Sequence, residues 1–232
     1  MNSEIKIPKS WDDVKVKSYL RYVDFVSDMK ADLEEANNLK EMGDIVGSNE
    51  IFLEYLPFKV SIKSLSILGE IPMDELDMLT MDELDKFTKD IAFILEPNKI
   101  KKNKKPMELV LRDEMGREYM FIPFDERSVK EAKQMEAFDY LYPDDSVMRI
   151  GWKFSVVLRG FQRVKDNLTG KEKIKWEPYD FDKCEYYKDI ILDGKVGDIM
   201  GLNDFFLNIH QGLLTPTPKS SQSKKSQKEY KV

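Results

Sequence analysis

The run "MELVLRDEMGREYMFIP" (residues 107–123) contains two apolar-rich segments on either side of Asp113-Glu114-Met115-Gly116. Gly116 can take the positive φ angle that a short turn requires, so this run predicts a β-hairpin. A second hairpin is expected where β-like spacing through Phe161 and Val164 is followed by the turn "KDNLTGKE" and the returning strand "KIKWEPY" (residues 173–179). Since most other apolar residues recur at helical spacing, we predict an α+β fold: a mostly helical body with two β-hairpins.

Helical spacing is clearest in the N-terminal half of the chain. Apolar residues from Val16 onward predict a helix that continues to Glu41 and is broken by "GDIVGSN" (residues 43–49). Residues 50–56 predict a short apolar helix or turn ended by Pro57, and residues 58–68 predict a further apolar segment.

The most regular pattern lies in "IPMDELDMLTMDELDKFTKDIAFIL" (residues 71–95). Pro72 stands near its first turn, and no further Gly or Pro occurs before Pro97, so one continuous helix is predicted. Two more helices are expected C-terminal to the first hairpin, over residues 129–141 and 197–214, the former capped by Ser128 or Asp125.

One phrase occurs twice, as "IPKSWDDVK" (residues 7–15) and "IPFDERSVK" (residues 122–130). In each copy a proline would end a strand, an aromatic residue would turn inward, and acidic residues would lie near the positive end of a new helix. We interpret both copies as strand-to-helix corners, the first preceded by a short strand at residues 5–7.

The chain is expected to divide into four parts. Residues 1–98 form a mainly helical part, and residues 99–106 form a lysine-rich linker. Residues 107–214 form a hairpin-plus-helix part packed on the first. Residues 215–232 are expected to be a disordered basic tail, because they are rich in Ser, Lys, Gln and Pro and poor in apolar residues.

Charge is unevenly distributed along the 232 residues, whose formal net charge is -6. The tail from Thr215 holds five lysines and one glutamate, so the rest of the chain is more acidic than the total suggests. An acidic body argues against nucleic acid as the main partner. The absence of a long apolar run argues against a membrane span, and the single cysteine fits a reducing cytoplasm.

No catalytic constellation is visible in the sequence. His210 and Cys184 are the only residues of their types, and no glycine-rich phosphate-binding motif occurs. The acids of residues 74–85 are expected on a solvated helix face, so an alternative interpretation as a metal-dependent hydrolase is weakly founded. We therefore expect no catalytic residue, no metal, no cofactor and no enzymatic activity.

Several short motifs follow one another in a particular order along most of the chain. They are Ile7-Pro8 with Trp11-Asp12-Asp13 and Tyr19, then Tyr119-Met120-Phe121-Ile122-Pro123, the apolar run ending at Arg159, Glu177-Pro178-Tyr179, and Phe205-Phe206. In this order the chain resembles small proteins encoded near the tail-tube and tape-measure genes of tailed bacteriophages, many of them regarded as tail assembly chaperones.

This resemblance implies a binding protein of the infected bacterial cytoplasm. It would hold apolar helical segments of the tape-measure protein, or bind the tail-tube protein, before the tail tube polymerises; homo-oligomerisation is left open. Bulk and position suggest Trp152, Met200, Phe205 and Phe206 as partner-binding residues. The alternative is a structural virion component, such as a connector, baseplate or internal protein, which would persist in mature particles.

Overall fold

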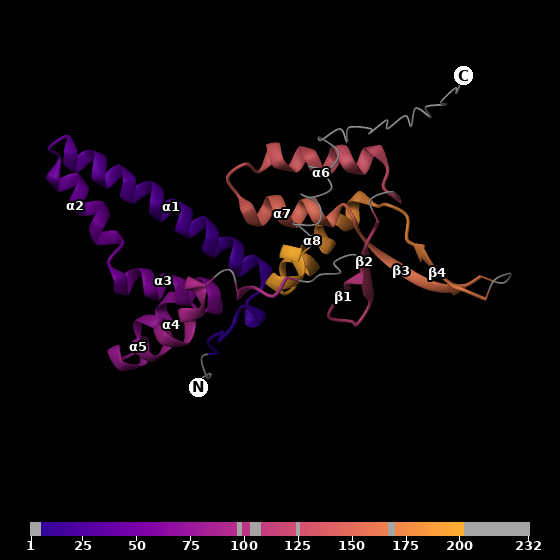
Figure 1. Cartoon of the computed structure of the whole chain (residues 1–232), viewed down its shortest axis with the longest axis horizontal. Coiled ribbons are helices and arrows are strands. Elements are labelled where there is room, and N and C mark those ends of the chain that lie inside the picture. Colours follow the sequence, from indigo (N-terminus) through magenta and orange to yellow (C-terminus); the bar gives the residue numbers. More distant parts are fainter. Residues whose placement is uncertain (1–5, 97–98, 103–107, 124–125, 167–169, 202–232) are drawn as a thin grey trace, which may run out of the picture.

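The computed structural model describes residues 6–96, 99–102, 108–123, 126–166 and 170–201 (Figure 1). The α-helices are α1 (Val16–Glu41), α2 (Ile45–Glu54), α3 (Pro57–Gly69), α4 (Met73–Asp77), α5 (Met81–Asp90), α6 (Val129–Leu141), α7 (Ser146–Ser155) and α8 (Cys184–Leu192). The 3-10 helices are η1 (Trp11–Asp13), η2 (Ile91–Leu95) and η6 (Phe181–Lys183), and the strands are β1 (Val110–Arg112), β2 (Glu118–Phe121), β3 (Leu158–Lys165) and β4 (Glu172–Trp176). The prediction of a mostly helical α+β fold with two β-hairpins is confirmed. The predicted tail, residues 215–232, lies outside the described residues.

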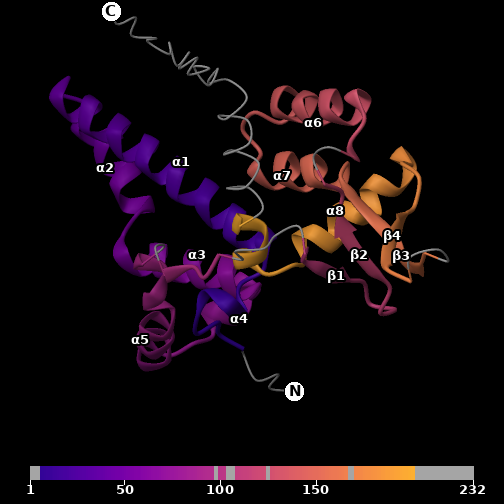
Figure 2. The same ribbon diagram turned by 45° about the vertical axis from the view of Figure 1, so that its right-hand side comes forward.

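The two hairpins join into one four-stranded antiparallel sheet of order β1-β2-β3-β4. In the first hairpin Leu111 pairs with Tyr119, and Gly116 in the turn has a φ of 76°, as expected for a short turn. The hairpins are joined by β2 and β3, in which Phe121 pairs with Leu158. The N-terminal end of β3 is buried, whereas its C-terminal half and β4 extend into solvent (Figure 2).

Helix α7 lies at the centre of the C-terminal part, where it contacts α6, α8 and α1. Asp145 caps α7 through the backbone N–H of Met148, and Ser128 caps α6 in a reciprocal capping box with Glu131. The core that these elements share combines helix and sheet residues, chiefly Val16, Leu20, Phe121, Phe138, Phe154, Val157, Leu158, Tyr187 and Ile191. The Ser128 cap matches one of the two cap residues that the sequence suggests.

The predicted continuous helix over residues 71–95 is wrong. The structure divides this segment into α4, α5 and η2, with residues 78–80 outside any helix. The Thr80 hydroxyl accepts a hydrogen bond from the backbone N–H of Glu83, and the Glu83 carboxylate accepts one from the Thr80 backbone N–H at 2.9 Å. This capping box starts a new helix, so the repeated Met-Asp-Glu-Leu marks two helix starts rather than one helical stripe.

Two further predictions at the N-terminal end are corrected. Residues 6–9 form no strand, and Ile5 lies outside the described residues, so the first copy of the repeated phrase is not a strand-to-helix corner. Trp11 is nevertheless buried in η1, and its indole N–H donates to the carbonyl of Glu96 at 3.2 Å. Pro57 begins α3 instead of only ending the segment before it, because proline at the first helical position lacks only an N–H that would be unpaired anyway.

The two ends of the described chain meet in one small apolar cluster. Its buried members are Trp11, Val14, Leu68, Ile100 and Val196, and Tyr19, Tyr22 and Met200 pack against it. Val196 donates its backbone N–H to the carbonyl of Val14, and Lys15 and Lys195 form an isolated β-bridge. Ile100, from the predicted lysine-rich linker, is thus part of this core. The division into 1–98, 99–106 and 107–214 stays a prediction.

A charged pair lies inside the C-terminal core. Arg159 of β3 has no exposed surface, and one of its terminal amines donates to a carboxylate oxygen of Glu131 on α6. Its other terminal amine donates to the carbonyl of Leu158, and its guanidinium lies 4.7 Å from the centre of the Tyr179 ring. Burial alone would raise the pKa of Glu131, but hydrogen bonds from Ser128 and the charge of Arg159 lower that pKa below its ordinary value.

In the described part of the chain, no helix combines the length and the apolar character that a membrane crossing requires.

The variant Glu131→Gln tests this pair, since glutamine keeps an acceptor for the α6 cap but removes the charge opposite Arg159. We expect the free energy of unfolding at pH 7 to fall by about 3 kcal/mol, because a buried guanidinium is left without a counter-charge. The double variant Glu131→Gln/Arg159→Met should recover part of this loss in urea denaturation.

The same pair makes stability depend on pH. Because the folded-state pKa of Glu131 is lowered, the stabilisation from its carboxylate is complete above pH ~4.5 and is lost as pH falls through the folded-state pKa. The single variant Glu131→Gln should lack this pH-dependent part of the stability. A loss below about 1 kcal/mol at pH 7 would contradict the assignment.

Candidate partner-binding surface

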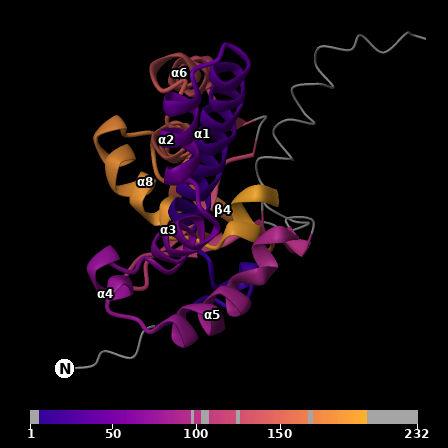
Figure 3. The ribbon, with the colours of Figure 1, turned by 90° about the vertical axis from the view of Figure 1, so that its left-hand side faces the viewer.

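Two helices form an arm that projects from the rest of the chain. It consists of the C-terminal half of α1 and all of α2, here taken as residues 28–56 and called the arm (Figure 1). Gly43, with a φ of 89°, ends the turn between the helices, and the Asp44 carboxylate caps α2 by accepting from the backbone N–H of Gly47 at 2.9 Å. Helix α2 then runs back beside α1 (Figure 3).

The inner face of α2 packs on α1. Ser48 is buried, and Ile51, Phe52 and Tyr55 are partly buried, at the spacings of three, four and seven residues that place side chains on one side of a helix. Ala36 of α1 is fully buried. Small side chains at Ser48 and Ala36 suit a close approach of the two helices, since interaxial distance depends on the side chains at the contact.

The outer face of α2 is apolar too, and solvent reaches it. Ile45 is 51% exposed, Val46 72% and Leu53 55%, and Leu56, which follows the helix, is 36% exposed. At 100° per residue Ile45, Val46 and Leu53 fall within an arc of roughly 100°, whose centre lies about 120° around the helix from that of the inner face. We call Ile45, Val46, Leu53 and Leu56 the outer stripe. An exposed apolar stripe on a projecting element is typical of a protein-binding surface.

The arm that carries the outer stripe is acidic. The arm carries eight carboxylates, Asp28, Asp32, Glu34, Glu35, Glu41, Asp44, Glu50 and Glu54, against two lysines, Lys30 and Lys40. All except Asp32 are exposed. An apolar stripe with a strongly negative rim selects for an apolar segment that carries positive charge, because like-charge partners are repelled.

The base of the arm contains an apolar groove. A cavity of about 510 Å³ is lined by residues of four helical elements, among them Phe25 of α1, Tyr55 at the end of α2, Phe58 and Ile62 of α3, and Met73 of α4. Phe58 and Met73 are also exposed. The groove extends the apolar surface from the end of α2 toward the body.

Tyr55 ties α2 to α1 at the base of the arm. Its hydroxyl donates a hydrogen bond to the Asp32 carboxylate, and this bond, with some burial and the nearby charges of Asp32 and Asp28, raises the pKa of Tyr55 to about 12. The phenol is therefore neutral and a donor at physiological pH. Its hydrogen bond joins the end of α2 to α1 on the inner face and leaves the outer stripe free.

The sequence-predicted partner-binding residues lie away from the arm or outside the described part. Trp152 is partly buried in α7, where its ring stacks on Phe138 at 5.6 Å and on Phe181 at 6.3 Å, with the Lys188 amine 4.8 Å from its centre. Met200 lies partly buried in a helical segment over residues 196–201 that joins the apolar cluster of Trp11. Phe205 and Phe206 lie outside the described residues, as does His210. Whether these residues bind a partner stays a prediction.

Sequence reasoning missed the outer stripe. The sequence predicts a break over residues 43–49 and a short helix or turn only over residues 50–56. The signal that could have shown α2 is Asp44, a cap residue placed before a run with apolar residues on more than one side.

Other residues with possible chemistry are inert or dispersed. Cys184 is fully buried, and burial raises the pKa of its thiol, as expected for an unreactive cysteine. The acids of residues 74–85 are exposed along α4 and α5. Over the described ranges, no three His, Cys, Asp or Glu residues gather in a way that could hold a metal ion.

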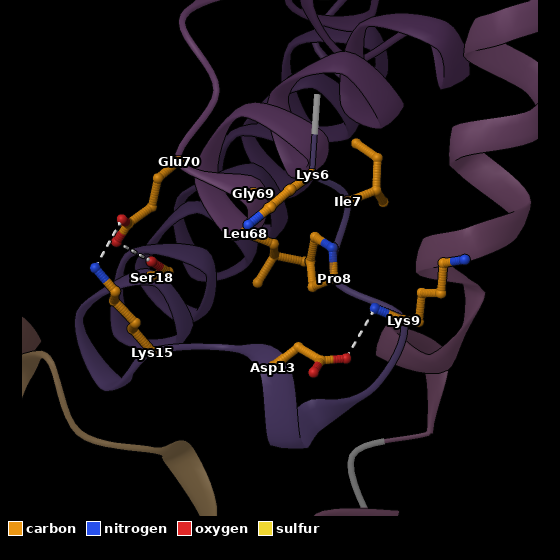
Figure 4. Close-up of a pocket in the computed structure, with 10 residues that line it drawn as sticks. All are labelled: Lys6, Ile7, Pro8, Lys9, Asp13, Lys15, Ser18, Leu68, Gly69 and Glu70. Atoms are coloured by element: carbon orange, nitrogen blue, oxygen red, sulfur yellow. Dashed lines mark hydrogen bonds and ion pairs between the residues drawn. The ribbon is translucent and has the colours of Figure 1, made fainter. Parts of the chain in front are cut away.

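A second cavity, of about 620 Å³, lies between the N-terminal segment, the base of α1 and the turn after α3 (Figure 4). Three of its lining residues are hydrogen-bonded: Glu70 accepts from Ser18 at 2.9 Å and from Lys15 at 3.2 Å. Beside the cavity, Lys15 and Lys17 both pair with Asp193. Burial alone would raise the pKa values of Glu70 and Asp193, but their hydrogen bonds and the two lysines lower both. We interpret this network as a structural tie between α1, α3 and the end of α8.

Comparisons of the chain with protein-family models, with curated proteins and with solved structures find no match.

Glu70 combines an ion-pair role with a left-handed backbone, since its φ is 53°. The variants Glu70→Ala and Glu70→Gly lose the same carboxylate, but only alanine keeps a Cβ in the left-handed region. We expect Glu70→Ala to be less stable than Glu70→Gly by about 0.5–1 kcal/mol in urea denaturation, although alanine is ordinarily the more stabilising residue. Equal stabilities, or a more stable alanine variant, would show that the backbone at this residue is not left-handed in solution.

Proposed function

We propose that the chain is a non-enzymatic binding protein whose arm holds apolar helical segments of another protein. The observation that carries this proposal is the outer stripe, which is apolar and exposed on an arm rich in carboxylates. A partner helix could lay its apolar side along the stripe, with its end in the groove at the base of the arm, as in helix-in-groove recognition.

The particular role that fits this surface is tail assembly in a tailed bacteriophage, with the tape-measure protein as partner. Support comes from the motif order that resembles tail assembly chaperones and from the need of such a chaperone for an exposed apolar surface on an acidic, charged exterior. A tape-measure protein offers long apolar helices that must stay separate until tube subunits assemble around them. The infected bacterial cytoplasm is the compartment where this would happen.

Physical considerations favour moderate affinity at this surface. The outer stripe contains four side chains on one helix, far fewer than the twenty or so residues per side of a typical stable interface. Binding of one copy should therefore be weak and reversible, which suits a protein that has to release its partner when polymerisation begins.

Co-expression of the chain with the tape-measure protein tests the proposal. We expect the soluble fraction of the tape-measure protein to rise, and the two proteins to co-purify. The double variant Val46→Asp/Leu53→Asp should abolish most of this gain, because it places two charges in the apolar contact. Each changed side chain is exposed, so each substitution should alter the free energy of unfolding by less than about 0.5 kcal/mol.

The matched control is Met115→Asp, which adds a charge at another exposed apolar residue, in the β1–β2 turn. This variant should keep the full solubility gain. The proposal would be contradicted if the unaltered chain gave no co-purification and no solubility gain. Mass spectrometry of purified virions separates the chaperone role from the alternative, because a structural virion component would be retained in the particles.

A further inference from the structure

Within the described residues nothing covers the outer stripe, and the chain itself contains a segment with the matching chemistry. Residues 202–214, "LNDFFLNIHQGLL", hold seven large apolar residues and one charged residue. Residues 215–232 follow directly, with five lysines and one glutamate. An apolar stretch continued by a basic stretch is complementary to an apolar stripe within a rim of carboxylates.

We infer that residues 202–232 bind the arm of the same chain, the apolar stretch on the outer stripe of α2 and the lysines against the surrounding carboxylates. The segment thereby shields the arm when no partner is present, and an incoming partner helix has to displace it. The inference rests on the proposed function only in taking the arm as the surface where a partner binds.

The described chain ends close enough to the arm for this contact. Met200 belongs to the same apolar cluster as Tyr22, on the first half of α1. From Tyr22 to Asp32, the partner of Tyr55, the rise along α1 is roughly 15 Å at 1.5 Å per residue. Thirteen residues span about 20 Å even if fully helical and about 43 Å if extended. If helical, residues 202–214 can therefore reach the Leu56 end of the outer stripe; if extended, they can also reach Ile45 and Val46, about 30 Å along α1 from Tyr22, with the lysines beyond them beside the carboxylates of the arm.

Charge favours this occupant over a second copy of the arm. Two arms facing each other would bring sixteen carboxylates and four lysines together, because each arm has eight and two. Repulsion between them opposes a symmetric arm–arm contact. The basic stretch has the opposite charge to the arm. Tethering gives it an effective concentration on the order of millimolar, so a free partner at a lower concentration has to bind the arm more tightly than the tethered segment does.

Zero-length coupling of lysine amines to carboxylates, followed by mass spectrometry, tests the contact in the full chain without any partner. We expect the lysines of residues 219–231 to couple mainly to carboxylates of the arm, with a yield independent of protein concentration. The acids of α4 and α5 are the internal control, because most of them are exposed and they are denser than those of the arm, with seven in fifteen residues against eight in 29. Coupling that is spread evenly over both sets, or absent from the arm, overturns the inference.

Hydrogen exchange provides the second measurement and addresses the apolar part. In the full chain, Phe205→Ser/Phe206→Ser should speed amide exchange in residues 48–55 at least about threefold, because the outer face of α2 loses its cover. Lys224→Glu/Lys225→Glu should do the same, whereas Met115→Asp should leave this exchange unchanged. No change in either variant overturns the inference, and coupling or protection that rises with protein concentration replaces it with the tail of a second copy as occupant.

These outcomes are separable from those of the co-expression experiment. A chain whose tail contacts the arm but which never binds a tape-measure protein keeps the inference and loses the proposed function. A chain that binds its partner equally well with and without Lys224→Glu/Lys225→Glu, and shows no coupling between tail and arm, keeps the proposed function and loses the inference. If both hold, the same charge-reversal variant should bind partner more tightly than the unaltered chain, because the competing segment is weakened.

Discussion

Helix α2 has apolar residues on two sides, but within the described residues its one extensive helical contact is with α1. Only the side toward α1, with Ser48, Ile51 and Tyr55, can be buried by that neighbour. The other side gains nothing from folding, since area left in water contributes none of the ~25 cal/mol per Å² that burial yields. Its apolar character is thus not explained by the stability of the arm, and this is the reason for proposing that it contacts another segment.

An exposed stripe of this kind is useful only if the arm keeps its position, and the rest of the structure provides for that. Val16 and Leu20, at the start of α1, are buried in the core that includes β2, β3 and α7. Trp11 and Val14 anchor the segment before α1 against Leu68 and Val196. The ion pairs of Lys15 and Lys17 with Glu70 and Asp193 join the same end of α1 to α3 and α8. The arm therefore extends from a base fixed on several sides.

Local patterns predicted the elements whose boundaries depend on neighbouring residues in the chain. The bounds of α1 and α6, both hairpins, and the cap Ser128 follow from spacing, turn glycines and side chains that bond to nearby N–H groups. The prediction of one helix over residues 71–95 was wrong because it relied on the helical spacing of apolar residues alone. Thr80 and Glu83 form a capping box, which is a signal for the start of a new helix. The site could not be predicted in the same way. The exposure of Val46 and the partial burial of Trp152 against Phe138 depend on which elements pack beside them. No alternation or spacing in the sequence encodes that packing.

The carboxylates of the arm limit what the outer stripe can do as much as the stripe itself does. An apolar helix exposed on a neutral surface would associate with any other such helix, including its own copies, because apolar burial is not directional. The negative charge of the arm makes the electrostatic free energy of association unfavourable with another acidic surface. With a basic segment the same charge makes it favourable. If the arm binds a partner as proposed, specificity arises from its carboxylates and affinity from the stripe. Since salt screens the carboxylates but leaves apolar burial in place, the selectivity of the proposed binding should be lost at high ionic strength before the binding itself is.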